Sequence, residues 1–82
     1  MSLHEIIEEL IEIIEDKTVP RNIRETVKQI KECLEDETLE FGVRRDRAIQ
    51  LFEEISTDPN LPMYTRTQIW SIIGMLEEEQ NI

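Results

Sequence analysis

The feature that most constrains this chain is a hydrophobic period of about 3.6 residues, the period of an α-helix, which recurs along most of the sequence. Only two glycines and three prolines interrupt it. In residues 3–16 apolar side chains occupy one arc of the helical wheel and acidic side chains occupy the other. No stretch of strand length alternates with a period of two, so we expect no β-sheet. The pattern therefore predicts amphipathic helices around one shared core.

Capping and turn signals divide the sequence into four predicted helices. Ser2 and Glu5 have the spacing of a capping box and predict the first helix. Proline suits the first turn of a helix, so Pro20 and Pro62 mark two later starts, and Gly42 marks a boundary between loop and helix. Short connections favour antiparallel neighbours, so we expect residues 1–82 to form a single all-α domain, a four-helix up-and-down bundle. The predicted helices cover about residues 2–16, 20–36, 42–57 and 62–79.

The expected core consists of the apolar residues that share one face of each predicted helix. A chain of this length has room for one compact core. We place Phe41 and Ile49 at the margin of the third helix. The expected core residues are Leu3, Ile6, Ile7, Leu10, Ile11, Ile13, Ile14, Ile23, Val27, Ile30, Cys33, Leu34, Ala48, Leu51, Phe52, Ile55, Ile69, Ile72, Ile73 and Leu76.

The chain also aligns with itself at an offset of about 42 residues. This register pairs Pro20 with Pro62 and divides the chain into two helical hairpins, about residues 2–37 and 42–80, each joined by an Asp- and Pro-containing turn. The pattern resembles a HEAT repeat. It departs from that family in the interval of eight residues from Asp to Arg, which is longer than usual. Two repeats are also too few for a solenoid, so we expect the hairpins to close face to face.

Each predicted hairpin carries an aspartate and an arginine at its turn. Asp16 and Asp58 end the first helix of each hairpin, and Arg24 and Arg66 lie in the first turn of the second. The helix dipole disfavours an arginine near an N-terminus. We therefore expect each arginine to fold back onto its aspartate, or onto carbonyl groups of the turn, and so to fix the angle of the hairpin.

The residues that perform catalysis in other proteins do not form a recognisable set here. Cys33, the single cysteine, lies near the C-terminus of the second predicted helix, where the dipole and nearby acids disfavour a thiolate. His4, the single histidine, lies in the first turn of the first helix, so a Cys–His pair is not expected. The sequence has no metal-binding spacing and no glycine-rich phosphate loop. We expect no catalytic residue, cofactor, metal or small-molecule substrate, and therefore no enzyme.

The charge distribution allows two interpretations. Nineteen acids and nine bases give a formal net charge of −10. One interpretation is a phosphate-binding strip on the second and third predicted helices that contacts RNA. The other is charge pairing with the acidic surface, which the net charge and the few aromatic residues favour. The basic strip comprises Arg21, Arg24, Lys28, Lys31, Arg44 and Arg45.

Large apolar residues outside the core face of the fourth predicted helix form a candidate interface. Met63 and Trp70 share one flank of that helix, and Tyr64 and Met75 lie on the other. Trp and Met are enriched at the centres of protein interfaces. Trp70 is equally consistent with a side chain that covers the edge of a small bundle. Met63, Tyr64 and Trp70 are the candidate interface residues.

Two segments, residues 18–24 (TVPRNIR) and 58–70 (DPNLPMYTRTQIW), resemble signatures of an uncharacterised family of short, acidic archaeal proteins. The resemblance covers nearly the whole chain. It implies an all-helical, four-helix protein of the archaeal cytoplasm, and it brings no activity, cofactor, partner or catalytic residue with it.

These observations together predict a non-catalytic protein–protein interaction or scaffolding module, which binds a protein partner or a second copy of itself. The alternative is an RNA- or ribosome-associated accessory protein that uses the basic strip. No apolar run approaches the length that crosses a membrane, so we expect no membrane association. The single cysteine fits a reducing compartment, so we expect the protein in the cytoplasm.

Overall fold

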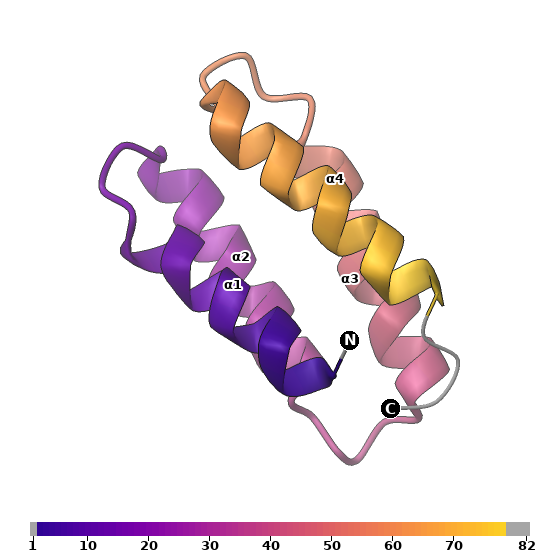
Figure 1. Cartoon of the computed structure of the whole chain (residues 1–82). Helices are drawn as coiled ribbons and strands as arrows, with labels where there is room; N and C mark the ends of the chain where they lie inside the picture. The colour runs from indigo at the N-terminus through magenta and orange to yellow at the C-terminus, as the bar shows by residue number, and fades with distance from the viewer. Residues whose placement is uncertain (1, 79–82) are drawn as a thin grey trace.

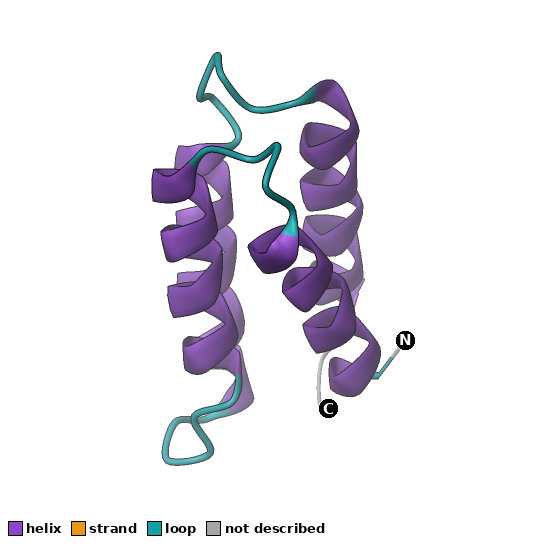
Figure 2. Ribbon diagram, turned by 90° about the vertical axis from the view of Figure 1, so that its left-hand side faces the viewer, coloured by secondary structure: helices purple, strands orange, loops and turns teal. Residues whose placement is uncertain are grey.

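The computed structural model describes residues 2–78, and this part of the chain contains four α-helices and no strand. Consecutive helices run in opposite directions, as Figure 1 shows, and loops alone connect them (Figure 2). The predicted all-α four-helix bundle is confirmed. The helices are α1 (Leu3–Glu15), α2 (Arg21–Leu34), α3 (Phe41–Ile55) and α4 (Met63–Glu78). The predicted end of the last helix at residue 79 lies outside the described residues.

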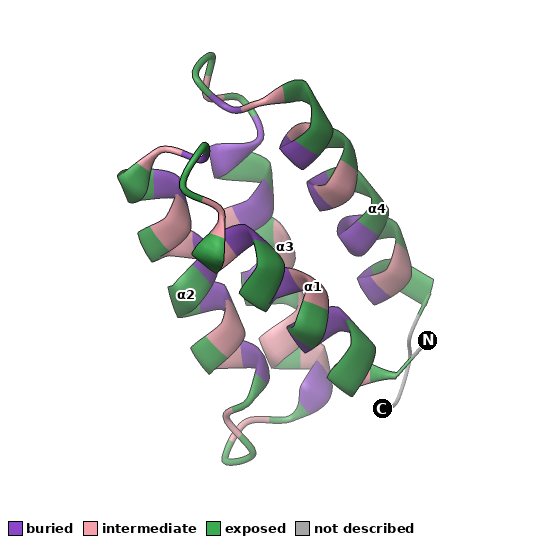
Figure 3. Ribbon diagram, turned by 60° about the vertical axis from the view of Figure 1, so that its left-hand side comes forward, coloured by how far each residue is buried: buried purple, intermediate pink, exposed green. Residues whose placement is uncertain are grey.

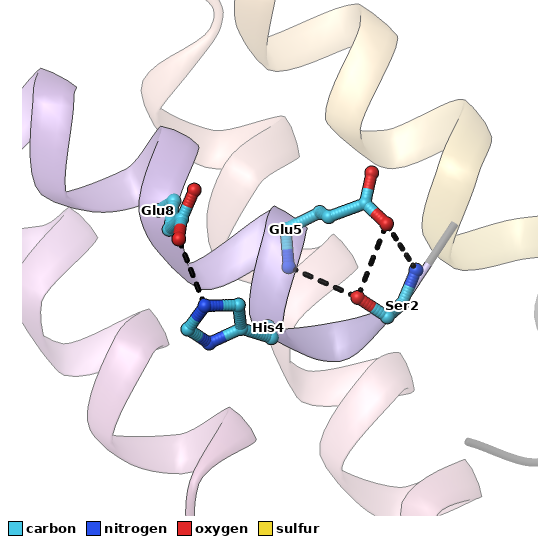
Figure 4. Close-up of polar contacts among 4 residues, drawn as sticks. All are labelled: Ser2, His4, Glu5 and Glu8. Carbon is cyan, nitrogen blue, oxygen red and sulfur yellow. Dashed lines mark hydrogen bonds and ion pairs between the residues drawn. The ribbon is translucent and has the colours of Figure 1, made fainter.

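The N-terminus of α1 carries the predicted capping box. The backbone N–H of Glu5 donates to Ser2 Oγ at 3.3 Å, and the backbone N–H of Ser2 donates to Glu5 Oε1 at 3.4 Å (Figure 4). These two bonds satisfy N–H groups that have no partner within the helix. The start of α1 is therefore fixed by its own sequence.

The core lies on the axis of the bundle, and each helix turns its buried face toward it (Figure 3). Leu10, Ile30, Phe52 and Ile72, one from each helix, are fully buried in a single apolar cluster. Burial of a large apolar side chain contributes about 1.5–3 kcal/mol. The loops contribute as well, because Val19 and Leu61 belong to the same cluster.

Six positions at the edges of the predicted apolar faces differ from expectation. Ile11 is 36% exposed, and four others are only half-buried: Leu3, Ile14, Cys33 and Leu51. The buried arc of these helices is thus narrower than the apolar arc of their sequences, so residues at its edge stay in contact with water. Phe41, expected at the margin, is buried, and it begins α3 one residue before the predicted start at Gly42.

The four helices do not contact one another equally. Close backbone approaches link α1 with α2, α2 with α3, and α3 with α4. α1 and α4 are not among these closely packed pairs, although the Nε2 of Gln68 donates to Glu12 Oε2 across them at 3.3 Å. We call this boundary the α1–α4 seam. No helix within residues 2–78 combines the length and the hydropathy needed to cross a bilayer.

Candidate functional site

The loop between α1 and α2 is held by an aspartate at its start and an arginine beyond its end. Asp16 Oδ1 accepts from the backbone N–H of Thr18 at 2.9 Å and from its hydroxyl at 2.6 Å. Arg24 Nε donates to the carbonyl oxygen of Val19 at 3.0 Å. Of the two partners expected for Arg24, it is the turn carbonyl, and not the Asp16 carboxylate, that receives its hydrogen bond.

The loop between α3 and α4 is held in a related way. Asp58 Oδ1 accepts from the backbone N–H of Asn60 at 2.8 Å. Arg66 donates from Nε to the carbonyl oxygen of Ser56 at 3.1 Å and from Nη2 to that of Asp58 at 2.9 Å. Ser56 is the C-cap of α3, so Arg66 satisfies a helix-end carbonyl that lacks a partner within its helix.

The loop between α2 and α3 has the same construction, which the sequence analysis missed. Asp36 Oδ1 accepts from the backbone N–H of Thr38 at 3.0 Å. Arg44 donates from Nε to the carbonyl oxygen of Leu39 at 3.0 Å and from Nη1 to that of Leu34 at 2.8 Å. All three loops thus carry an aspartate, an aliphatic residue three positions later and an arginine eight positions later.

The three aspartates are 20 and 22 residues apart. The smallest repeated unit of the chain is therefore one helix with its loop, half of the hairpin unit that the offset of about 42 residues indicated. The signal was present in the sequence, but a search for paired Asp and Pro residues passes over Asp36, because Glu40 occupies the position of the proline. The HEAT-like description of the hairpins stays a prediction.

The residues of the predicted basic strip are mostly engaged within the chain. Arg24 and Arg44 hold loops, Lys31 Nζ lies 2.9 Å from Glu35 Oε1, and Arg45 Nε lies 3.3 Å from Asp46 Oδ1. The two remaining residues of the strip, Arg21 and Lys28, are exposed on α2. The structure therefore does not bring the six cations together as one uncommitted surface.

The histidine and the cysteine have separate surroundings. His4 Nε2 lies 2.8 Å from Glu8 Oε1 at the exposed start of α1 (Figure 4). Cys33 Sγ donates to the carbonyl oxygen of Arg44 at 3.9 Å and is half-buried on α2. Within residues 2–78, no group of three or more His, Cys, Asp or Glu side chains could hold a metal ion.

The exposed surface of α4 is uncharged over most of its length. Met63 is 74% exposed, Tyr64 76% and Trp70 51%. We call the exposed residues from the start of the helix to its last glycine the α4 face. They are Met63, Tyr64, Thr67, Trp70, Ser71 and Gly74.

The other helices are different. In each of α1, α2 and α3, four of the six exposed positions carry Asp, Glu, Lys or Arg. In α4 two of the eight exposed positions do, Glu77 and Glu78, and both follow the α4 face at the end of the helix. In a chain with 34% charged residues, an uncharged surface over three helical turns is a local exception. It brings the three candidate interface residues together on one helix, with small residues beside them.

Gly74 adds an observation that no contact within the chain explains. A Cβ atom at this position would have no heavy atom within 4 Å, and its backbone φ is not positive. Glycine in the exposed interior of a helix costs about 1 kcal/mol relative to alanine. The isolated fold therefore does not require glycine here.

Acidic side chains follow α1, and some of them border the α4 face at the α1–α4 seam. One hollow is lined by residues 5, 8, 9 and 12 of α1, all glutamates, and a second by Glu12, Glu15, Asp16, Tyr64 and Gln68. The hollows share Glu12, and the second one reaches α4. Two hydrogen bonds from Thr18 lower the pKa of Asp16 below its usual value. The bond from the Thr18 hydroxyl has the larger effect, and the bond from its backbone N–H has the smaller one. We call residues Glu5, Glu8, Glu9, Glu12, Glu15 and Asp16 the acidic row.

Comparison with known proteins places the chain in a family. Residues 1–78 match the sequence model of the family described as "Uncharacterised protein family (UPF0147)". The chain belongs to this family. The UPF0147 protein TK2131 of Thermococcus kodakarensis is 43% identical over 81 residues, which cover 93% of this chain and 98% of that protein. The UPF0147 protein MJ1419 of Methanocaldococcus jannaschii is 54% identical over 83% of this chain and 73% of its own length.

Two crystal structures share the fold of this UPF0147 chain. The protein of unknown function MMP1188 superposes with a TM-score of 0.92 at 49% identity, over 96% of this chain and 90% of that one. A UPF0147 protein from Thermoplasma acidophilum superposes with a TM-score of 0.86 at 32% identity, over 90% of this chain and 87% of that one. The resemblance to an archaeal family inferred from residues 18–24 and 58–70 is confirmed, and the names of these relatives state no activity.

Proposed function

We propose that this UPF0147 protein is a non-catalytic interaction module of the cytoplasm that binds another protein through the α4 face. The observation that carries the proposal is the uncharged, exposed surface around Trp70 on a chain with a net charge of −10. Interface centres are depleted of charged residues and enriched in Trp, Tyr and Met. Tryptophan and tyrosine are also among the residue types most enriched at binding hot spots.

The size of the α4 face supports the proposal. A fully exposed large side chain offers about 150–250 Å², so at their exposed fractions Met63, Tyr64 and Trp70 alone offer roughly 400 Å². A standard interface buries about 800 Å² on each partner. The α4 face with its rim is therefore large enough for a specific complex of modest affinity.

The non-catalytic part of the proposal rests on where the reactive side chains lie. His4 is paired with Glu8 at one end of α1, and the Cys33 thiol contacts the backbone of Arg44, so neither activates the other. RNA binding through the basic strip is the weaker alternative, because four of its six cations already have partners within the chain.

A site-specific photo-crosslinking experiment in cell extract tests the proposal. A crosslinker at Thr67, on the α4 face, is expected to capture a discrete protein, and the same group at Gln50, exposed on α3, is not. Trp70→Ala should abolish the product, because it removes the largest side chain of the face. Val43→Ala, which truncates an exposed apolar residue on α3, should leave it unchanged. Equal capture at both positions, or a product that survives Trp70→Ala, would contradict the proposal.

A further inference from the structure

We infer that the partner of the α4 face is an amphipathic helix whose apolar side chains pack on Trp70 and whose lysine or arginine side chains lie along the acidic row. This inference rests on the proposed function and specifies the chemistry of the partner. It is carried by the position of an uncharged face directly beside a border made only of acids.

The two halves of the surface run side by side. The hydrogen bond between Gln68 and Glu12, and the hollow that Tyr64 shares with Glu12, Glu15 and Asp16, show that the C-terminal part of the acidic row lies beside α4. Glu5 to Asp16 and Met63 to Gly74 each span about 16 Å of helix, at 1.5 Å per residue. A helix of about three turns laid on α4 therefore matches the acidic row in length and meets the acids of α1 where they lie beside Tyr64 and Gln68.

The small residues of the α4 face favour a helix as the bound element. Thr67, Ser71 and Gly74 lie on the exposed side of α4 at spacings of four and three residues, which places them in one row. Small side chains in such a row let a second helix backbone approach closely, while the Met63 and Trp70 side chains contact its apolar residues. The backbone of the bound helix would then occupy the open space beside Gly74, which no atom of the isolated chain fills.

Charge complementarity selects a basic partner over a second copy of this chain. Each copy carries −10, so association of two copies brings together surfaces that repel. If two α4 helices packed antiparallel about a two-fold axis, the two α1 helices would lie on the same side of the interface. The acidic rows would then oppose each other. A partner with lysine or arginine on that side gains attraction where a second copy meets repulsion.

Peptide binding tests the inference, with the single tryptophan of the chain as the reporter. The probe is an 18-residue synthetic helix without aromatic residues, with leucine on one face and lysine along one flank. A matched peptide carries glutamate in place of lysine, and a third carries serine in place of leucine. The lysine–leucine peptide is expected to bind and to shift the Trp70 emission to shorter wavelength, and binding should weaken as NaCl rises from 50 to 300 mM. The two control peptides should bind at least about tenfold more weakly.

Two matched triple variants locate the binding site. Glu9→Gln/Glu12→Gln/Glu15→Gln removes three charges of the acidic row and should weaken binding of the lysine–leucine peptide about tenfold. The control removes three acids exposed on α2 and α3, in the variant Glu25→Gln/Glu32→Gln/Glu53→Gln. It changes the net charge by the same amount and should weaken binding less than about twofold. Circular dichroism verifies that both variants are folded.

Several results would overturn the inference. These are no binding of the lysine–leucine peptide at 50 mM NaCl, equal weakening by the two triple variants, and equal binding of the glutamate peptide. Sedimentation as a dimer that Trp70→Ala dissociates would identify a second copy as the occupant and would overturn it too. The proposed function is judged separately, because loss of the Thr67 crosslink in Trp70→Ala supports a docking face even when the basic peptide fails.

Discussion

At the scale of single residues, arginine has the same task in each of the three loops. Arg24, Arg44 and Arg66 all lie in the first turn of a helix and donate to backbone carbonyls of the loop or of the preceding helix end. The guanidinium group suits this task, because its donors form a planar fork that remains charged. The unfavourable position of a cation near a helix N-terminus is thereby offset by carbonyl oxygens that carry partial negative charge.

Replacing Arg44 tests this task directly. Arg44→Met keeps the aliphatic stem and removes two hydrogen bonds to carbonyl oxygens, together with the guanidinium 5.7 Å from the centre of the Phe41 ring. We expect the free energy of unfolding to fall by about 2 kcal/mol, measured by urea denaturation. Arg47→Met, which removes an exposed cation from the same helix, should change it by less than about 0.5 kcal/mol. Equal effects of the two variants would show that the loop contacts of Arg44 contribute no stability.

At the scale of helices, α4 differs from the others because it exposes an uncharged face and contains Gly74. Its buried side is apolar apart from Thr65 and includes Ile69, Ile72 and Leu76. The two unfavourable residues, Gly74 and the exposed Trp70, therefore both lie on the outer side of the helix. With glycine at position 74, α4 has a lower helix propensity than it would have with alanine there. A loss of stability of this kind is common where a surface serves binding.

Substituting the glycine separates folding from binding. Gly74→Ala should raise the free energy of unfolding by about 1 kcal/mol, because alanine has the higher helix propensity and the new Cβ meets open space. The same variant should weaken binding of the lysine–leucine peptide, since the methyl group holds the incoming helix away. Gly42→Ala is the control, because it lies in the first turn of α3, where the new Cβ would contact only Arg45 Nη2, at 3.8 Å. Destabilisation by Gly74→Ala would mean that the fold itself requires the glycine.

The helices, the capping box and most of the core could be predicted from sequence, because hydrophobic period and cap chemistry are local properties. Exposure at the edge of a face depends on how closely the neighbouring helix approaches, and period alone does not contain that distance. Ile11 and Cys33 were misplaced for this reason. The continuity of the α4 face is only half visible in the sequence, because the helical period places Met63 and Tyr64 on opposite flanks of the predicted core face, and their exposure depends on how the neighbouring helices pack. The role of Arg44 was missed because its loop lacks the proline of the other two.

At the scale of the whole molecule, charge is distributed unevenly around a uniform core. The charged side chains of α1 are all acids, and Glu12, Glu15 and Asp16 lie beside α4, whereas α2 and α3 expose both signs. The loop aspartates contribute in another way, since each bonds a backbone N–H two residues later. The pKa values of Asp16 and Asp36 are lowered by hydrogen bonds from a threonine hydroxyl and by these backbone bonds, so acidic pH acts on their loops as well as on the surface of the bundle.

The pH dependence of stability should show the contribution of the loop residues Asp16 and Asp36. Hydrogen bonds from Thr38 lower the pKa of Asp36, mainly the bond from its hydroxyl and to a smaller extent the bond from its backbone N–H. The same two groups of Thr18 lower the pKa of Asp16. A carboxyl with a lowered pKa in the folded state contributes stability above its usual value of 3.8. That contribution is lost as the pH falls through the lower, folded pKa. The wild type should therefore lose stability steadily as the pH falls below about 4.

The variant Asp16→Asn/Asp36→Asn keeps oxygen acceptors but does not titrate. Its thermal midpoint should be lower than that of the wild type at pH 7 and should fall less between pH 5 and pH 3. Glu25→Gln/Glu32→Gln, which removes two exposed acids of α2, should retain the wild-type slope more closely. Parallel slopes for the wild type and the aspartate variant would rule out the loops as acid-sensitive points.

The same arrangement of aspartate, aliphatic residue and arginine recurs in all three loops, and this recurrence has a consequence for protein engineering. The segment that reverses the chain has nine residues, from Asp36 to Arg44 in the central example, and the hydrogen bonds of its Asp and Arg side chains to the loop go to backbone groups. We therefore expect such a segment to form the same turn between two other amphipathic helices whose core can bury its aliphatic residue, as the present core buries Val19 and Leu61. A chain built from units of one helix and one such loop lengthens or shortens by one helix at a time. Bundles with an odd number of helices are then as accessible as bundles with an even number.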